Sequence, residues 1–323
     1  MLADQLLPVG GEVMKTFGAT KAWWLPVLAV ALAAVVAGCG STKVESEPEP
    51  VVEEVVKPKI VEADFECYRE QLTIRGVEVR PEGVEGLPVA VVSHGFMATK
   101  ESTIGYARLL ASWGFAAYCF DFCGGSTEGK SDGETTDMSV LTEKRDLEAV
   151  IEYAQDLPYT GDKLVLMGCS QGGFVSALAA SELQDAVSAL VLFYPALCIP
   201  DDARRGQMID AHFDPDDIPD TIACGPMTLG WVYPTAVIDM DVAEQIAGYT
   251  GAVFLAHGTA DEIVGVSYAK EAYQTYTGGS PDAHPEKELL LIENAQHGFS
   301  QKEDDQAMAA VKAFLSKNGF ALQ

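Results

Sequence analysis

From residue 61 onward, short apolar runs alternate with segments in which apolar side chains recur at helical spacing. The apolar runs predict buried strands at residues 88–94, 116–122, 163–167, 187–194, 252–257 and 288–292. The helical spacing predicts helices at residues 102–113, 139–156, 172–181, 266–276 and 303–316. Residues 65–80 alternate polar and apolar positions on either side of Arg75 and Gly76, which predicts a leading antiparallel hairpin. This order predicts an α/β fold with a mostly parallel central sheet and helices on both faces.

One stretch interrupts the alternation. Residues 197–248 contain His212, Trp231 and Tyr233 but no clear pairing of a strand with a helix. An irregular segment of about 50 residues inside a compact domain is usually a functional loop or lid. We therefore expect an inserted lid at about residues 197–248, in which His212 is a candidate for contact with substrate.

The first 60 residues follow a different pattern. Residues 25–37 form a 13-residue apolar run, whereas a membrane-spanning helix needs about 20 residues. Lys15 and Lys21 precede the run, and Ala37 and Gly38 end it directly before Cys39, as in a secretory signal peptide. Residues 36–39 also resemble a bacterial lipobox, in which the cysteine becomes the lipidated first residue of the mature protein.

We therefore expect a lipoprotein signal peptide at residues 1–38, a flexible tether at 39–60 and the folded domain at 61–323. The tether is rich in Glu and Pro, a composition that favours an extended chain. Lipidation of Cys39 would anchor the exported domain to a bacterial membrane, outside the cytoplasm. The alternative is an ordinary cleavage site beside a chance cysteine. Met14, followed by Lys15, is a more usual signal-peptide start than Met1, so the true start codon stays open.

Charge and cysteine spacing narrow the range of partners. The chain has 21 Lys and Arg against 48 Asp and Glu, a net charge of −27. This excess of acid argues against nucleic-acid binding through a basic patch and against docking on anionic lipid through lysines. The cysteines outside the leader show no metal-binding spacing, so we expect neither a metal nor an organic cofactor. Outside the cytoplasm they could pair, Cys119 with Cys123 for example, but we expect free buried thiols. These cysteines are Cys67, Cys119, Cys123, Cys169, Cys198 and Cys224. The oligomeric state stays open, a homodimer included.

The segment from Gly168 to Gly172 has the pattern G-x-S-x-G, with Ser170 at its centre. It follows the predicted strand at 163–167 and opens the predicted helix at 172–181. A strand, a tight turn and a helix in this order hold the serine in a strained conformation with its hydroxyl exposed. We therefore predict that Ser170 is a nucleophile.

A serine nucleophile needs a histidine base that a carboxylate orients. His297 lies on a loop after the last predicted strand, and Asp261 follows the predicted strand at 252–257. The chain order Ser170, Asp261, His297 is typical of α/β-hydrolases. Glu262 is the alternative to Asp261.

An oxyanion hole needs two backbone N–H groups that point at developing negative charge. In this order of elements Gln171, directly after the nucleophile, is expected to supply one of them. Phe96, two residues after His94 at the end of the first parallel strand, is expected to supply the other. His94 itself is expected to be structural, or to line the pocket and bind substrate.

These motifs together resemble the bacterial cinnamoyl (feruloyl) esterases and their monoacylglycerol-lipase-like relatives. The matching stretches are residues 94–100, 120–126, 168–173, 257–261 and 297–299, spread over residues 65–316. The resemblance implies cleavage of hydroxycinnamic acid esters, with Asp202 and Tyr233 of the lid near the phenolic hydroxyl. The chain departs from the family pattern at Cys169, where a histidine is common, and at residues 123–125.

The sequence therefore predicts a serine carboxylic-ester hydrolase that acts on a small-molecule ester through an acyl-enzyme on Ser170. An acylglycerol lipase or a serine peptidase on the same fold is the enzymatic alternative. A binding lipoprotein that keeps the fold without the activity is the non-enzymatic alternative. The acyl and alcohol groups of the substrate stay undetermined.

Overall fold

The computed structural model describes residues 58–277 and 286–323. The expected signal peptide, Cys39 and all but the last three residues of the expected tether lie outside the described residues, so these expectations stay predictions. Within the part of the chain that is described, no helix is both long enough and apolar enough to cross a membrane.

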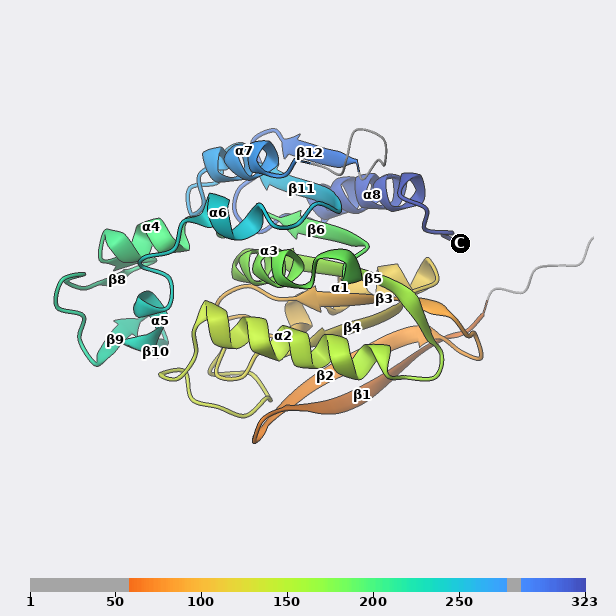
Figure 1. Cartoon of the computed structure of the whole chain (residues 1–323), viewed down its shortest axis with the longest axis horizontal. Helices are drawn as coiled ribbons and strands as arrows, with labels where there is room; N and C mark the ends of the chain where they lie inside the picture. The colour runs from red at the N-terminus through yellow and green to blue at the C-terminus, as the bar shows by residue number, and fades with distance from the viewer. Residues whose placement is uncertain (1–57, 278–285) are drawn as a thin grey trace, which may run out of the picture. The chain divides into compact units, whose positions relative to one another are not determined.

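An eight-stranded sheet forms the centre of the described chain, in the order β1-β2-β4-β3-β5-β6-β11-β12 (Figure 1). Its strands are β1 (Ile60–Arg69), β2 (Leu72–Pro81), β3 (Leu87–Ser93), β4 (Ala116–Phe120), β5 (Thr160–Cys169), β6 (Ala189–Phe193), β11 (Ala252–Gly258) and β12 (Lys287–Ile292). β2 pairs antiparallel with β1 and with β4, and every pair from β4 to β12 is parallel. The predicted fold class is confirmed.

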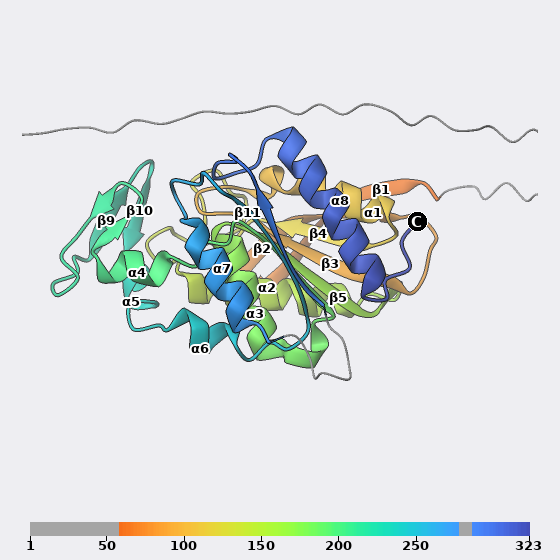
Figure 2. The ribbon, with the colours of Figure 1, turned by 90° about the horizontal axis from the view of Figure 1, so that it is seen from above.

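Helices cover both faces of this sheet (Figure 2). α1 (Ile104–Ser112) and α8 (Gln301–Lys317) lie on one face, and α2 (Val140–Gln155), α3 (Gln171–Leu183) and α7 (Val266–Thr275) lie on the other. There are also two short 3₁₀ helices: η1 (Lys100–Ser102) precedes α1, and η2 (Gln184–Ala186) follows α3. Val91 and Val92 of β3 pack in opposite cores, because successive residues of a strand point to opposite faces. The central strands are therefore apolar along their whole length, which explains the apolar runs in the sequence.

Two of the long helices begin at serine caps. Ser139 precedes α2, where its hydroxyl accepts from the Thr142 N–H and its own N–H donates to the Thr142 hydroxyl. At α8 the Ser300 N–H donates to the Glu303 carboxylate. Such reciprocal bonds satisfy backbone donors that a first helical turn leaves without partners, so they define where each helix starts.

The leading hairpin turns earlier than its sequence pattern indicates. Glu70 and Gln71 form the turn, with Glu70 at a φ of +56°, and Gly76 lies inside β2. A Cβ atom at Gly76 would lie 2.3 Å from the ring of Phe65 on β1. Gly76 therefore makes room for an aromatic ring across the hairpin and does not mark the turn.

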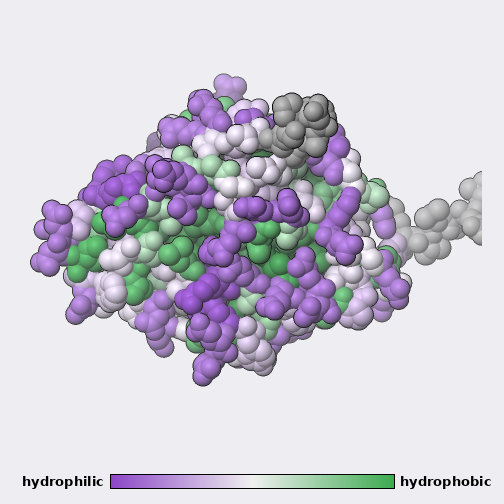
Figure 3. Space-filling model, viewed as in Figure 1, coloured by the Kyte–Doolittle hydropathy of each residue, from purple (hydrophilic) through white to green (hydrophobic). Residues whose placement is uncertain are grey.

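The segment between β6 and β11 is an insertion with short elements of its own. It contains α4 (Ile199–Arg204), β7 (Gln207–Met208), β8 (Ala211–His212), β9 (Thr221–Cys224), β10 (Met227–Gly230), α5 (Val232–Thr235) and α6 (Val242–Ile246). β7 pairs with β8 and β9 pairs with β10, both antiparallel. Figure 1 shows α4, α5 and these strands at one end of the sheet, and Figure 3 shows hydrophobic residues among hydrophilic ones at that end. That the insertion acts as a lid stays a prediction.

All six cysteines of the described chain are buried, and none forms a disulfide. This confirms the expectation of free buried thiols. Burial raises the pKa of the Cys169 thiol, directly before Ser170, to about 12. These thiols are therefore protonated at neutral pH and unreactive in the folded protein.

Candidate active site

Ser170 occupies the sharp turn between β5 and α3. Its backbone has a φ of 53° and a ψ of −121°, a conformation that costs a residue with a side chain about 1–3 kcal/mol. The Ser170 N–H donates to the Phe193 carbonyl of β6 at 2.9 Å, which helps to hold the turn. A Cβ atom at Gly168 would lie 2.2 Å from the Gly172 carbonyl oxygen, and one at Gly172 would lie 2.3 Å from the His94 carbonyl oxygen. Both glycines of the motif are therefore required by close backbone contacts.

His297 lies beside this serine. Its Nε2 atom is 2.9 Å from Ser170 Oγ, and its Nδ1 atom is 2.8 Å from Asp261 Oδ2. Asp261 follows β11 and His297 follows β12, and these two strands are parallel neighbours, so the loops after them meet at one edge of the sheet. An Nδ1–H that donates to the carboxylate leaves Nε2 free to accept the serine proton. The three residues are therefore arranged as nucleophile, base and orienting acid.

Asp261 is held by donors on both carboxylate oxygens. Its Oδ1 accepts from the N–H groups of Ile263 and Val264 at 2.9 and 2.8 Å, and its side chain is fully buried. The Nε2 atom of His257 lies 3.3 Å from Asp261 Oδ2 and 2.9 Å from the Val264 carbonyl oxygen. Burial alone would raise the pKa of Asp261, but the hydrogen bonds from His257, His297 and the Val264 N–H hold it well below its ordinary value. Asp261 therefore stays ionised beside the histidine.

Glu262, the alternative acid, has a different environment. It is exposed and lines the cavity that opens at Ser170, while the hydrogen bond to His297 comes from Asp261. The geometry thus favours Asp261 over Glu262.

The two expected oxyanion donors lie at the same cavity as Ser170. Gln171 is the first residue of α3, so its N–H has no acceptor within the helix. Among residues 58–277 and 286–323 the N–H of Phe96 has no backbone acceptor. A Cβ atom at Gly95 would lie 3.0 Å from Ser170 Cβ, which shows how closely the Phe96 loop passes Ser170.

A buried ion pair fixes the base of that loop. Asp121, after β4, accepts from both the N–H and the ammonium group of Lys100 at 2.7 Å, and from the Lys130 N–H at 2.8 Å. Burial alone would raise the pKa of Asp121, but these bonds from Lys100 and Lys130 outweigh it and lower the pKa. The carboxylate therefore ties the loop after β3 to the loop after β4.

The cavity at Ser170 has a volume of about 260 Å³ and runs between the sheet edge and the insertion. Its wall is largely apolar and includes Phe96, Ile199, Met208 and Val264. Asp202 of α4 is among the polar residues that line it, and its carboxylate pairs with Arg205. Such a cavity suits an apolar group whose far end carries a hydrogen-bond donor.

Two residues expected to bind substrate have other partners. Tyr233 lines the cavity but is only 1% exposed, and its hydroxyl proton is donated to Gln171 Oε1. His94 is buried, with Nδ1 2.8 Å from the Gly95 carbonyl oxygen and Nε2 accepting from the Phe122 N–H at 3.2 Å. The expected substrate contact of His94 is therefore wrong, because both ring nitrogens are hydrogen-bonded to backbone groups. His212, the third candidate, is exposed on β8 and does not line this cavity.

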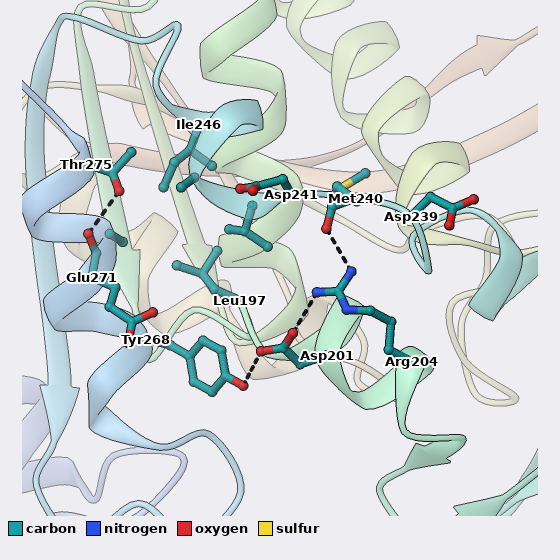
Figure 4. Close-up of a pocket in the computed structure, with 13 residues that line it drawn as sticks. Leu197, Asp201, Arg204, Asp239, Met240, Asp241, Ile246, Tyr268, Glu271 and Thr275 are labelled. Atoms are coloured by element: carbon teal, nitrogen blue, oxygen red, sulfur yellow. Dashed lines mark hydrogen bonds and ion pairs between the residues drawn. The ribbon is translucent and has the colours of Figure 1, made fainter. Parts of the chain in front are cut away.

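A second cavity of about 390 Å³ lies beside α4 and α7 (Figure 4). Arg204 donates to Asp201 at 2.6 Å and to the Met240 carbonyl at 3.1 Å, and Tyr268 donates to Asp201 at 2.7 Å (Figure 4). None of Ser170, Asp261 and His297 lines it. The larger cavity is thus separate from the catalytic geometry.

The described part of the chain holds no group of three or more His, Cys, Asp or Glu side chains arranged to bind a metal ion.

Comparisons with known proteins find similar hydrolases. A family model described as serine aminopeptidase, S33, matches residues 87–213. No curated protein matches the chain. Est1E from Butyrivibrio proteoclasticus, solved with ferulic acid bound, is similar with a TM-score of 0.70 and 25% identity, over 78% of this chain and 98% of that one.

Two further solved structures share the fold. An esterase from Pyrococcus furiosus is similar with a TM-score of 0.58 and 20% identity, over 80% of this chain and 91% of that one. A monoacylglycerol lipase from Paleococcus ferrophilus is similar with a TM-score of 0.55 and 20% identity, over 78% of this chain and 99% of that one.

The chain is an enzyme, a serine hydrolase with the α/β-hydrolase fold.

Proposed function

We propose that this ester-hydrolysing enzyme acts through Ser170, His297 and Asp261, with the N–H groups of Phe96 and Gln171 as its oxyanion hole. The observation that carries the proposal is the hydrogen-bonded sequence from Asp261 to His297 to Ser170, at 2.8 and 2.9 Å, beside a cavity. This order of acid, base and nucleophile is the arrangement that activates a serine hydroxyl.

The proposed reaction has two halves. Ser170 Oγ attacks the ester carbonyl carbon while its proton passes to His297 Nε2, and the carbonyl oxygen becomes an oxyanion that the two N–H groups stabilise. His297 then protonates the leaving alcohol, which yields an acyl-enzyme. Water, deprotonated by His297, attacks the acyl carbon, and the bond from that carbon to Ser170 Oγ breaks as His297 returns the proton to Oγ, which releases the acid and restores the enzyme. Asp261 stabilises the imidazolium that forms in each half.

We propose a hydroxycinnamoyl ester as the substrate class. The apolar wall of the cavity would take the aromatic acyl group, and Asp202 would accept a hydrogen bond from its phenolic hydroxyl. Ile209 and Ile263 line the cavity although they are 55% and 62% exposed, so the cavity also offers apolar surface to solvent. The net charge of −27 favours a neutral ester over an anionic one. The similarity to Est1E, which binds ferulic acid, supports this choice.

The first experiment compares Ser170→Ala with the wild type on p-nitrophenyl acetate. Loss of the nucleophile is expected to lower kcat about 10⁶-fold, the scale found when a catalytic serine is removed. Ser176→Ala is the matched control, because Ser176 lies on the same helix and its buried hydroxyl has no hydrogen-bond partner among the described residues. Unchanged hydrolysis by Ser170→Ala would rule out the proposed mechanism.

A substrate panel then separates the related activities. Methyl ferulate, a monoacylglycerol and an aminoacyl anilide represent the hydroxycinnamoyl esterase, the lipase and the peptidase. The proposal expects the highest kcat/KM on methyl ferulate, and Asp202→Ala is expected to lower kcat/KM for methyl ferulate more than for methyl cinnamate, which lacks the phenolic hydroxyl. Equal losses on both esters would remove Asp202 from substrate recognition. A wild-type protein that a fluorophosphonate probe fails to label would indicate a binding protein.

We also propose that the enzyme is exported and held at a bacterial membrane by lipidated Cys39. The support is the sequence alone: the apolar run at 25–37 and the small residues directly before Cys39. Mass spectrometry of the mature N-terminus is expected to find a diacylglyceryl group on Cys39, and Cys39→Ser is expected to release the enzyme from the membrane fraction. An unmodified Cys39 in the mature protein would contradict the proposal.

A further inference from the structure

Three buried side chains from distant parts of the chain form a continuous hydrogen-bonded path beneath Ser170. Gln171 Nε2 donates to Glu143 Oε2 of α2 at 2.7 Å, and the Tyr233 hydroxyl of α5 donates to Gln171 Oε1. Each of the three residues is only 1% exposed. Because water does not reach them, a bond lost here would not be replaced by solvent.

These bonds hold the Gln171 amide at both of its polar atoms. Its nitrogen donates to Glu143 on α2 and its oxygen accepts from Tyr233 on α5. The side chain is therefore held at both ends, by the core of the sheet on one side and by the insertion on the other.

Burial shifts the carboxyl group of Glu143, at one end of this path, toward its neutral form. Burial is the largest influence on Glu143 and raises its pKa well above the ordinary value, with a further rise from nearby Asp146 and an opposing effect from the Gln171 hydrogen bond. A neutral carboxyl group can still accept from Gln171. An ionised one would oppose the negative charge that the proposed reaction places on the substrate oxygen.

Tyr233 touches both residues that supply the proposed oxyanion donors. Its hydroxyl is bonded to the side chain of Gln171, and its ring centroid lies 5.6 Å from that of Phe96. Gln171 lies at the start of α3 and Phe96 lies in the loop after β3. Tyr233, from the insertion, is thus a contact that they share.

We propose that Tyr233 and Glu143 are positioning residues that hold the N–H groups of Phe96 and Gln171 in the positions that an oxyanion hole needs. The oxyanion hole is then complete only with the insertion in place. The inference rests on the proposed function, since it concerns the reaction of Ser170 with a carbonyl group. Donor N–H groups are effective only within about 2.7–3.1 Å of the position that the oxyanion takes. A donor that is loosened but still present is therefore expected to cost less than one that is removed.

The test uses the full chain and single substitutions that change one bond at a time. Tyr233→Phe removes only the hydroxyl and keeps the ring on Phe96. It is expected to lower kcat on p-nitrophenyl acetate about tenfold, a fraction of the 10²- to 10³-fold loss from a missing donor, with KM changed less than about twofold. Tyr268→Phe is the matched control: it removes a hydroxyl that bonds Asp201 at the second cavity, and its kcat is expected to equal that of the wild type.

Glu143 gives an independent pair of variants. Glu143→Leu removes the acceptor and is expected to lower kcat about tenfold, whereas Glu143→Gln keeps an acceptor oxygen without charge and is expected to recover most of that loss. Thermal unfolding of each variant shows whether it is folded. If the variants at one of the two positions, Tyr233 or Glu143, are unfolded, the comparison uses the variants at the other position.

A transition-state analogue separates positioning from packing. A trifluoromethyl ketone bound to Ser170 places its oxyanion in the hole, so Tyr233→Phe is expected to weaken its binding about tenfold while KM for the ester stays. A purely structural role would lower the melting temperature and leave both kcat and inhibitor affinity unchanged, which would overturn the inference. So would a raised KM at constant kcat, because it would make Tyr233 a substrate-binding residue.

The outcomes also distinguish this inference from the proposed function. A wild type that hydrolyses none of the esters would contradict the proposed function. The rate at which a fluorophosphonate labels Ser170 would still test the path, because its phosphoryl oxygen enters the same hole. A wild type that is active on esters, with Tyr233→Phe equally active and equally inhibited, would contradict this inference alone.

Discussion

Asp261→Asn is the sharpest single perturbation of the proposed mechanism, because it changes one atom that faces two histidines. The amide oxygen can keep the bonds from the Ile263 and Val264 N–H groups, which Asp261 Oδ1 accepts at 2.9 and 2.8 Å. The fold of this loop is therefore expected to survive. The new NH₂ group takes the place of Oδ2, which now lies 2.8 Å from His297 Nδ1 and 3.3 Å from His257 Nε2.

That exchange reverses the hydrogen bond to the base. An NH₂ group donates, so His297 Nδ1 has to accept, and the ring proton moves to Nε2. Nε2 then carries a hydrogen at 2.9 Å from Ser170 Oγ and cannot take the serine proton. A base held in this wrong tautomer lowers kcat about 10⁴-fold, which corresponds to about 5 kcal/mol in the activation barrier.

The assay is the hydrolysis of p-nitrophenyl acetate, with kcat and KM determined separately and circular dichroism to establish folding. Glu262→Gln is the matched control, since Glu262 is the adjacent acid and is exposed at the cavity. Its kcat is expected to stay within about twofold of the wild type. If folded Asp261→Asn retained more than a tenth of the wild-type kcat, Asp261 would not orient the base. If Glu262→Gln fell by orders of magnitude instead, the acid would be Glu262.

Three further predictions concern stability and reactivity. Gly172→Ala is expected to lower the free energy of unfolding in urea by about 3 kcal/mol, because its Cβ atom would lie 2.3 Å from the His94 carbonyl oxygen. Gly105→Ala, with no atom within 4 Å, is expected to change it by less than about 1 kcal/mol. Asp121→Asn is expected to cost about 3 kcal/mol at pH 7, because Lys100 loses its buried partner. The folded-state pKa of Asp121 is depressed, so the difference in stability between the wild type and Asp121→Asn should be full above the ordinary carboxyl pKa and should shrink below about pH 4. Urea unfolding at pH 7 and pH 3 measures this difference. Iodoacetamide at pH 8 is expected to leave the buried thiols of the folded protein unmodified by mass spectrometry, because burial raises the pKa of each one: Cys67, Cys119, Cys123, Cys169, Cys198 and Cys224.

The fold and the acid–base geometry were accessible from the sequence because their signals are local. An apolar run before Ser170 and small residues after it predict a strand, a turn and a helix without any knowledge of distant residues. The parallel order of the strands then brings the ends of β11 and β12 together, so Asp261 and His297 follow from the alternation of elements. In the hairpin, by contrast, Gly76 is misleading as a turn signal. A glycine is needed there because the ring of Phe65 on the opposite strand leaves no room for a side chain.

The insertion could not be predicted in the same way. Its elements are short, from two to six residues, and the packing that stabilises them comes from distant parts of the chain. Tyr233 illustrates the difficulty: the residue can be singled out from the sequence, but its bond to Gln171 depends on a contact across 62 residues. For Glu143 the sequence does contain a signal. It lies on the same helical stripe as Val140, Leu147 and Val150, and an acid on a buried stripe indicates a buried partner.

These contacts bear on how specificity and rate are connected in this enzyme. α4 separates two cavities, with Asp202 lining the one at Ser170 and Asp201 lining the other. The same insertion supplies Tyr233, whose ring contacts Phe96 and whose hydroxyl contacts Gln171. A substitution that moves the insertion would therefore change the shape of the cavity at Ser170 and the position of both proposed oxyanion donors together. Substrate preference would then vary in kcat as well as in KM, because binding and stabilisation of the transition state depend on one segment. The catalytic motifs, which lie outside that segment, cannot by themselves identify the ester that the enzyme prefers.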